Sequence, residues 1–104
     1  MAIVHRRVFF GKVGIAGPLV EHLRAGDQIL AKNGARFTTR ILTDDRTGRS
    51  DRVVVEWEME SASELNTTIE QAMANPESQN EMAQWMEKLA PMIEYAEGEN
   101  WVIQ

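Results

Sequence analysis

The sequence predicts a single α+β domain in which a four-stranded sheet carries helices on one face. Three observations support this fold class. A clearly alternating β-rich run lies at the middle of the chain, segments with helical periodicity precede and follow it, and further β-rich runs stand near both ends. With 104 residues, of which 43% are hydrophobic and 26% charged, the chain has the length and composition of one globular domain.

The central strand is expected over residues 51–60, where apolar and acidic side chains alternate. Strand side chains point to opposite faces in turn, so this run has one apolar face and one acidic face. We expect helices to cover the apolar face and the acidic face to point away from them. The apolar set is Val53, Val55, Trp57 and Met59, and the other set is Val54, Glu56, Glu58 and Glu60.

The first strand is expected over residues 2–10, and neither of its faces is purely apolar or polar. One face holds His5 and Arg7, with Ile3 and Phe9, and the other holds Arg6, with Val4, Val8 and Phe10. Either face could lie on the same side of the sheet as Glu56 and Glu58. The alternation of this strand therefore leaves its orientation open.

A glycine-bearing loop over residues 11–17 leads into the first helix, with Pro18 at its first position, where a missing N–H costs nothing. This helix runs to about Lys32, and Asn33-Gly34 supplies a left-handed stop. Gly26 lies inside it and permits either a kink or close packing. The buried stripe consists of Leu19, Leu23, Ile29 and Leu30, with Val20 at its edge.

The second strand is expected over residues 35–43, and a polar connection over residues 44–50 makes a hairpin with the central strand. Ser61 and Glu64 have the spacing of a capping box that opens the second helix. Asn75-Pro76 ends this helix and starts another segment, which Pro91 stops. The apolar stripes are Leu65, Ile69, Ala72 and Met73, then Met82, Trp85, Met86 and Leu89.

The last strand is expected over residues 93–104, with a break at Gly98. The full order of strand, helix, strand, strand, split helix and strand is the ferredoxin-like βαββαβ arrangement. Right-handed crossovers predict that the first and central strands are parallel neighbours in the middle of the sheet. The second and last strands should then form its edges.

Composition narrows the classes of function. A net charge of −5 argues against a nucleic-acid partner, which needs concentrated Lys and Arg to neutralise phosphates. The absence of cysteine excludes disulfides and thiolate metal sites, and it fits a reducing cytoplasm. No apolar run reaches membrane-spanning length. We therefore expect a cytoplasmic protein with neither a membrane nor a nucleic-acid partner.

A sheet with helices on one side leaves a second face to solvent or to a partner. Here that face should mix apolar side chains with Glu and Arg or His, whose cross-strand pairs each contribute roughly 0.2–1 kcal/mol. Such a face suits a self-complementary two-fold contact, the commonest kind of oligomer interface. The sequence therefore predicts a homodimer.

Several loose signatures together resemble the NIPSNAP-like branch of the dimeric α/β-barrel superfamily. They are the His5-Arg6-Arg7 strand, the Gly11-Lys-Val-Gly14 lead into a helix, Thr47-Gly48 before Val-Val-Val-Glu-Trp, and the Asn75-Pro76 start of a Trp-bearing helix. The resemblance implies two ferredoxin-like subunits whose sheets pack face to face into a barrel. It also implies a small-molecule cleft between sheet and helices.

Members of that superfamily include cofactor-free oxygenases of aromatic or quinone-like substrates, haem-degrading oxygenases, muconolactone-type isomerases and proteins with no known activity. Trp57 resembles the third-strand Trp of the haem-degrading branch. The first strand has no Asn and the second helical segment no His, so the catalytic set of that branch is incomplete here. The resemblance therefore implies no cofactor for this chain.

His5 is the candidate catalytic residue, because a carboxylate such as Glu56 or Glu58 on the adjacent strand could orient its imidazole as a general base. The plainer interpretation places His5 in a polar network without chemistry. A metal site from His5, His22 and Glu58 has no supporting local spacing, so we expect none. Glu56 and Glu58 could share acid/base work. We favour Arg-paired or solvated charges for them.

Phe9, Trp57 and Trp85 are the candidate ligand-binding residues, as aromatic walls for a flat organic molecule. The competing interpretation is that Trp57 and Trp85 are core residues, and the two roles can coexist. Three functions follow as hypotheses: binding of a small hydrophobic or aromatic molecule, a cofactor-independent monooxygenase or isomerase that uses His5, and a non-catalytic dimerisation module.

Overall fold

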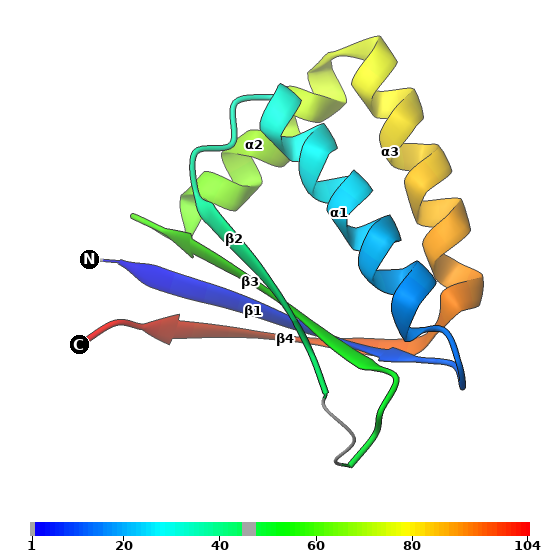
Figure 1. The fold of residues 1–104 in the computed structure, drawn as a ribbon. Helices are drawn as coiled ribbons and strands as arrows, with labels where there is room; N and C mark the ends of the chain where they lie inside the picture. The colour runs from blue at the N-terminus through cyan, green and yellow to red at the C-terminus, as the bar shows by residue number, and fades with distance from the viewer. Residues whose placement is uncertain (1, 45–47) are drawn as a thin grey trace.

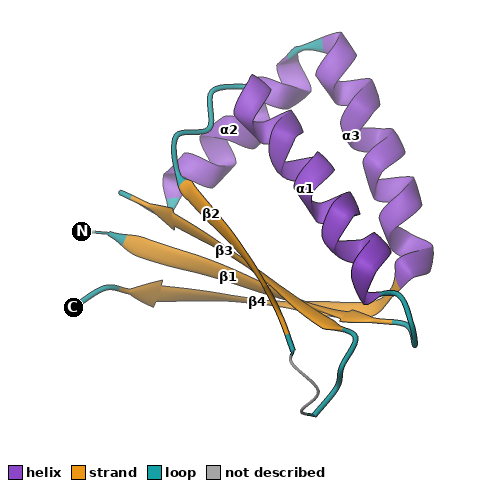
Figure 2. Ribbon diagram, viewed as in Figure 1, coloured by secondary structure: helices purple, strands orange, loops and turns teal. Residues whose placement is uncertain are grey.

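A computed structural model describes residues 2–44 and 48–104, and it contains one sheet with all of its described helices on one face (Figures 1 and 2). Residues 45–47 of the predicted hairpin connection, including Thr47 of the Thr-Gly signature, lie outside the described residues. The elements in chain order are β1 (Ile3–Gly11), α1 (Ala16–Lys32), β2 (Thr38–Thr43), β3 (Arg52–Met59), α2 (Ser63–Ala74), α3 (Pro76–Leu89), a 3-10 turn (Ala90–Met92) and β4 (Ile93–Val102).

The strand order β2-β3-β1-β4 confirms the ferredoxin-like fold, with β1 and β3 in the middle and β2 and β4 at the edges. The predicted parallel pairing of β1 and β3 is wrong, because all three neighbouring pairs are antiparallel. The α1 crossover makes β2 parallel to β1, and the hairpin then reverses the chain into β3. β3 must therefore run opposite to β1.

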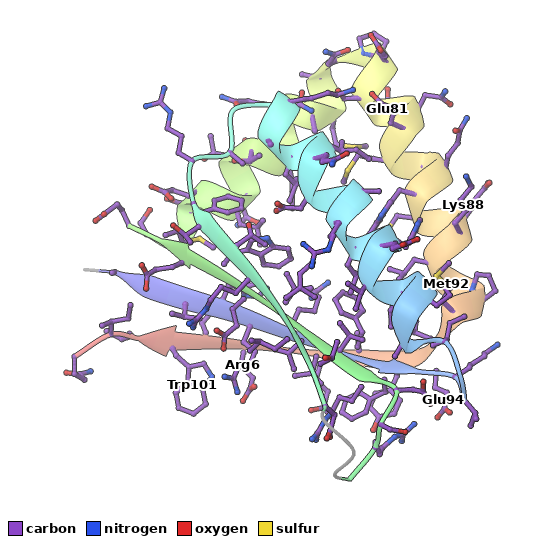
Figure 3. All side chains as sticks on the ribbon, viewed as in Figure 1. Arg6, Glu81, Lys88, Met92, Glu94 and Trp101 are labelled. Atoms are coloured by element: carbon purple, nitrogen blue, oxygen red, sulfur yellow. The ribbon has the colours of Figure 1, made fainter. Side chains whose placement is uncertain are left out.

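The register decides which face of β1 looks toward the helices. His5 pairs with Trp57, and Arg6 pairs with Glu56. Since Trp57 belongs to the apolar face, the face of His5 and Arg7 lies on the helix side, and Arg6 shares the open face with Glu56. Figure 3 shows Arg6 and Trp101 pointing away from the helices.

The core lies between the sheet and α1, with α3 closing one end. Its buried cluster confirms the predicted apolar faces of β3 and α1. Two predicted helix-stripe residues are instead exposed: Met73 at 46% and Met86 at 55%. Thr68, which donates to the Glu64 carbonyl, takes a buried position in α2. The cluster consists of Phe9, Leu19, Leu23, Val53, Val55 and Leu89.

α1 begins at Ala16, two residues before the predicted start at Pro18. The reason is a cap from a distant part of the chain. The Asp51 carboxylate accepts hydrogen bonds from the backbone N–H groups of Gly14 (3.0 Å) and Ala16 (3.2 Å). The first backbone N–H groups of a helix have no carbonyl acceptor within the helix, and the Asp51 carboxylate supplies one. The end of α1 is as predicted, with Gly34 at φ +94°.

The other predicted boundaries are partly right. Asn75 caps α3, because its side chain accepts from the backbone N–H of Glu77 at 3.0 Å. The capping box at Ser61 is wrong: α2 begins at Ser63, and the Ser61 hydroxyl pairs with the Ser63 hydroxyl at 2.9 Å. The predicted break at Gly98 is also wrong, since β4 pairs with β1 in regular register through that residue.

Gly26 marks close packing of α1 against α3. A Cβ atom at this position would lie 2.6 Å from the ring of Trp85, so any other residue would require the ring or a helix to shift. Trp85 is held there by its indole N–H, which donates to the His22 carbonyl at 2.6 Å. Among the described residues, no helix is both long and apolar enough to cross a membrane.

Candidate functional site

The helix-facing side of the sheet is covered unevenly. The helices pack over β3 and the end of β1, where Phe9 is 4% exposed. β4 differs, because every one of its residues after Ile93 is exposed. Gly98 and Asn100 of β4 pair with Arg7 and His5 and so lie on the same face as Phe9. An accessible strip therefore runs along β1 and β4 on the helix side of the sheet.

His5 lies on this strip with a fixed ring orientation. Its ring stacks on Trp57, the cross-strand partner, with centroids 5.5 Å apart and planes at 9°. Its Nδ1 lies 2.6 Å from the Oδ1 atom of Asn100. An amide oxygen only accepts, so Nδ1 carries the proton and Nε2 holds the lone pair of the neutral imidazole. The predicted carboxylate partner was wrong, because Glu56 and Glu58 lie on the other face of the sheet.

Trp57 is in turn held from the side of α1. Its indole N–H donates to Oδ1 of Asp27 at 3.3 Å, and the hydroxyl of Thr39 donates to the same oxygen at 2.8 Å. Phe37 meets the indole edge-on, with centroids 6.3 Å apart. The base of the His5 stack is therefore fixed by both polar and aromatic contacts.

Arg7 completes the group on the strip. Its cross-strand neighbours, Val55 and Gly98, are both uncharged. No hydrogen bond or ion pair joins the guanidinium to any residue within the described ranges. A Cβ atom placed on Gly98 would lie 3.7 Å from both Nη2 of Arg7 and Cε1 of His5. We call His5, Arg7, Trp57, Gly98 and Asn100 the His5 site.

The other two predicted ligand residues lie elsewhere. Phe9 is a core residue under α1. Trp85 stacks on His22, with centroids 4.9 Å apart, and the His22 Nε2 atom donates to the Trp85 carbonyl at 2.8 Å. These contacts join α1 to α3 and border a shallow groove of about 320 Å³ on the outer helix surface, which Lys32 and Glu81 also line. The structure thus brings together His5 and Trp57, but not Trp85.

The open face of the sheet carries a separate charged cluster. Glu56, 5% exposed, lies between Arg6 and Arg40, its cross-strand neighbours on either side. Arg6 Nε donates to one carboxylate oxygen at 2.9 Å, and Arg40 Nη2 donates to the other at 2.6 Å. The hydrogen bonds from Arg6 and then Arg40 lower the pKa of Glu56 below its usual 4.5, against the opposing effect of burial. The lowered pKa favours the charged form of Glu56, which suits an ion pair better than proton transfer.

No group of three His, Cys, Asp or Glu side chains in the described part of the chain is arranged to hold a metal ion. The sequence contained the signal for Trp57 and His5, but not for Arg7 and Asn100. Arg7 would have been found once the side of β1 that faces the helices was known. Asn100 could not, because its distance of 95 residues from His5 has no local pattern.

The four-stranded antiparallel sheet with one helical layer is a ferredoxin-like α+β fold, and solved structures confirm its likeness to NIPSNAP proteins. An uncharacterized NIPSNAP domain protein from Burkholderia xenovorans has a TM-score of 0.76 and 21% identity, covering 98% of this chain and 94% of that one. A NIPSNAP family protein from Agrobacterium tumefaciens has a TM-score of 0.76 and 17% identity, covering 99% and 86%.

A cofactor-independent oxygenase, SnoaB from Streptomyces nogalater, shares the fold with a TM-score of 0.69 and 10% identity, covering 99% of this chain and 93% of its own. The sequence matches no protein-family model and no curated protein. At these identities the likeness establishes the fold alone.

Proposed function

We propose that the protein binds a small, flat aromatic molecule in the cytoplasm, at the His5 site on the helix-facing side of the sheet. One observation carries this proposal: the imidazole of His5 is stacked and hydrogen-bonded into one orientation on a strip that the helices leave accessible. A core histidine would be covered by its neighbours. A mobile surface histidine would not be fixed by two partners at once.

The chemistry of the site favours an aromatic ligand. Stacked rings offer a flat, polarizable surface, and Gly98 places no side chain beside the His5 ring. The partners beneath Trp57 hold this surface in place before any ligand arrives, which lowers the ordering cost of binding. Phe9 and Trp85 are then packing residues, in the core and between α1 and α3, and not ligand contacts.

An NMR titration with 2-naphthamide tests the proposal, with the indole N–H signals of the tryptophans as reporters. We expect saturable shifts of Trp57, because the probe binds beside its stack with His5. Trp101 lies on the opposite face and is 57% exposed, so Trp101→Phe should leave this binding unchanged. The proposal fails if only Trp101 responds, or if no saturable shift is seen with 2-naphthamide, 2-naphthoate, 4-nitrophenolate or 4-nitroanisole.

A second candidate function is cofactor-independent proton transfer to or from such a molecule, as in a monooxygenase or isomerase. It is favoured by the Nε2 lone pair of His5, which accepts no hydrogen bond from the described residues and which Asn100 orients from the other side of the ring. Naphthalene-1,4-diol is a suitable probe. Oxygen uptake above its uncatalysed rate that is lost in His5→Ala, while folding is kept, would favour an enzyme over a binding protein.

We also propose that the protein is a homodimer through the open face of its sheet. This face combines apolar side chains with charges of both signs, and so can complement a second copy of itself under two-fold symmetry. Tyr95 and Trp101 are 46% and 57% exposed on it. In the alternative of a non-catalytic dimerisation module, this face would be the only functional surface. The apolar residues are Val4, Val8, Phe10, Leu42, Val54, Tyr95 and Trp101.

A further inference from the structure

We infer that the molecule bound at the His5 site carries an anionic oxygen, which the guanidinium of Arg7 holds over Gly98. The inference rests on the proposed function and names the chemical class of its ligand: an aromatic ring with a carboxylate or an ionised phenol or enol. Two observations support it, the uncompensated charge of Arg7 and the shape of the space beside it.

The positive charge of Arg7 is not balanced by its neighbours on the sheet. Arg7 lies on β1, a central strand, and its side chain lies on the helix-facing side. Within the described ranges, the residues that surround it in the register on this face are all uncharged or histidine. They are His5, Phe9, Val53, Val55, Trp57, Ala96, Gly98 and Asn100. On the other face of β1, by contrast, Arg6 has Glu56 as its partner. Among the residues that the structure describes, no hydrogen bond or ion pair therefore uses the charge of Arg7.

The space beside Arg7, left by the missing side chain of Gly98, borders both the guanidinium and the His5 ring. The position of an absent Cβ on Gly98 is 3.7 Å from Nη2 and 3.9 Å from Nε of Arg7, and 3.7 Å from Cε1 of His5. An atom near this point touches the fork of the guanidinium and the edge of the imidazole together. A guanidinium presents paired N–H donors that match the oxygens of a carboxylate or phenolate. The attached ring would then lie along the His5 and Trp57 stack.

Matched probe pairs test the inference by NMR titration. 2-Naphthoate and 2-naphthamide share a ring but differ in charge, as do 4-nitrophenolate and 4-nitroanisole. We expect the wild-type protein to bind the anion of at least one pair about 10-fold or more tightly than its neutral partner, in line with one charge-assisted contact. The pair that shows the preference distinguishes a carboxylate ligand from a phenolate or enolate.

Two variants assign the preference to Arg7 and Gly98. Arg7→Gln should remove it, while Lys12→Gln, which removes one positive charge from an exposed loop residue, should keep it. Gly98→Ala keeps every charge and has no positive φ to strain, yet its methyl group fills the space between guanidinium and imidazole. It should weaken anion binding about 10-fold.

The outcomes distinguish failure of the inference about the anion from failure of the binding function. Equal affinity for anion and neutral probe in the wild-type protein, or a preference that survives Arg7→Gln, overturns the inference and leaves the binding function standing. If none of the four probes gives saturable shifts, the binding function fails, and the inference about its ligand fails with it.

Discussion

At the scale of single residues, the ion pairs of Glu56 on the open face of the sheet are expected to stabilise the folded protein. Glu56→Gln removes a carboxylate that accepts from two arginines, so we expect a loss of roughly 1–3 kcal/mol in the free energy of unfolding. Chemical denaturation at neutral pH measures the change. The matched control is Glu58→Gln, on the same strand and face but exposed, which should change stability by less than about 0.5 kcal/mol.

The pH dependence of this effect has a definite sign. The pKa of Glu56 is lower in the folded state than its ordinary value of 4.5, so the folded protein binds fewer protons there than the unfolded chain. The stabilisation is therefore complete above pH 4.5 and is lost as pH falls through the lower folded-state pKa. The difference between wild type and Glu56→Gln should shrink in the same direction. A constant difference down to acid pH would contradict the role of the ion pairs.

The His5 site shows which residue-level features a sequence can reveal. Trp57 stands out because it lies on a strand with clear alternation, and His5 stands out as one of only two histidines in the sequence. Their contact depends on the register of β1, and the mixed faces of β1 did not determine it. The polar partners, Asn100 and Asp27, come from β4 and α1, and only the folded chain brings them to the site.

At the scale of secondary-structure elements, glycines in α1 provide a direct comparison. Gly26→Ala places a methyl group 2.6 Å from the Trp85 ring, so either α3 must move or the ring must turn. We expect destabilisation of about 1–3 kcal/mol, although alanine is the better helix former. Gly17 has no atom within 4 Å of its would-be Cβ atom. Gly17→Ala should therefore stabilise the protein by up to about 1 kcal/mol.

Thermal and denaturant unfolding of the two glycine variants measure this contrast. A Gly26→Ala protein as stable as Gly17→Ala would mean that the α1 and α3 contact gives way at little cost. In that case the interlocked pair of His22 and Trp85 would not fix the spacing of the two helices.

Element boundaries were predictable where the signal was local. Asn75-Pro76 and Asn33-Gly34 end or start helices through bonds within a few residues, and both were read correctly. The start of α1 was misplaced because its cap, Asp51, lies 35 residues from Ala16 in the sequence. The predicted element order itself requires β1 and β3 to be antiparallel, because the hairpin after β2 reverses the chain, so the parallel prediction was not a consequence of that order.

At the scale of the whole molecule, the open face of the sheet is the surface that determines assembly. The domain is thin, with principal extents of 37 × 37 × 17 Å, and one broad side of it is a sheet face without helices (Figure 2). Val8 lies near the middle of this face, between Val54 and Glu97 on the neighbouring strands. A stable dimer buries roughly 1,200–2,000 Å² in total, which requires most of such a face.

Val8→Lys therefore tests the proposed dimer. A lysine ammonium at the centre of a closed interface would lose its hydration. We therefore expect the dissociation constant of the dimer to rise about 100-fold, equivalent to roughly 3 kcal/mol. Sedimentation equilibrium at micromolar concentration should show a dimer for the wild type and a monomer for Val8→Lys. Val13→Lys, at a loop position that is 97% exposed, should remain a dimer. Circular dichroism checks that both variants keep their fold. A monomeric wild type would refute the dimer, whereas a dimeric Val8→Lys would place the interface elsewhere, with β4 and its free edge as the next surface to test.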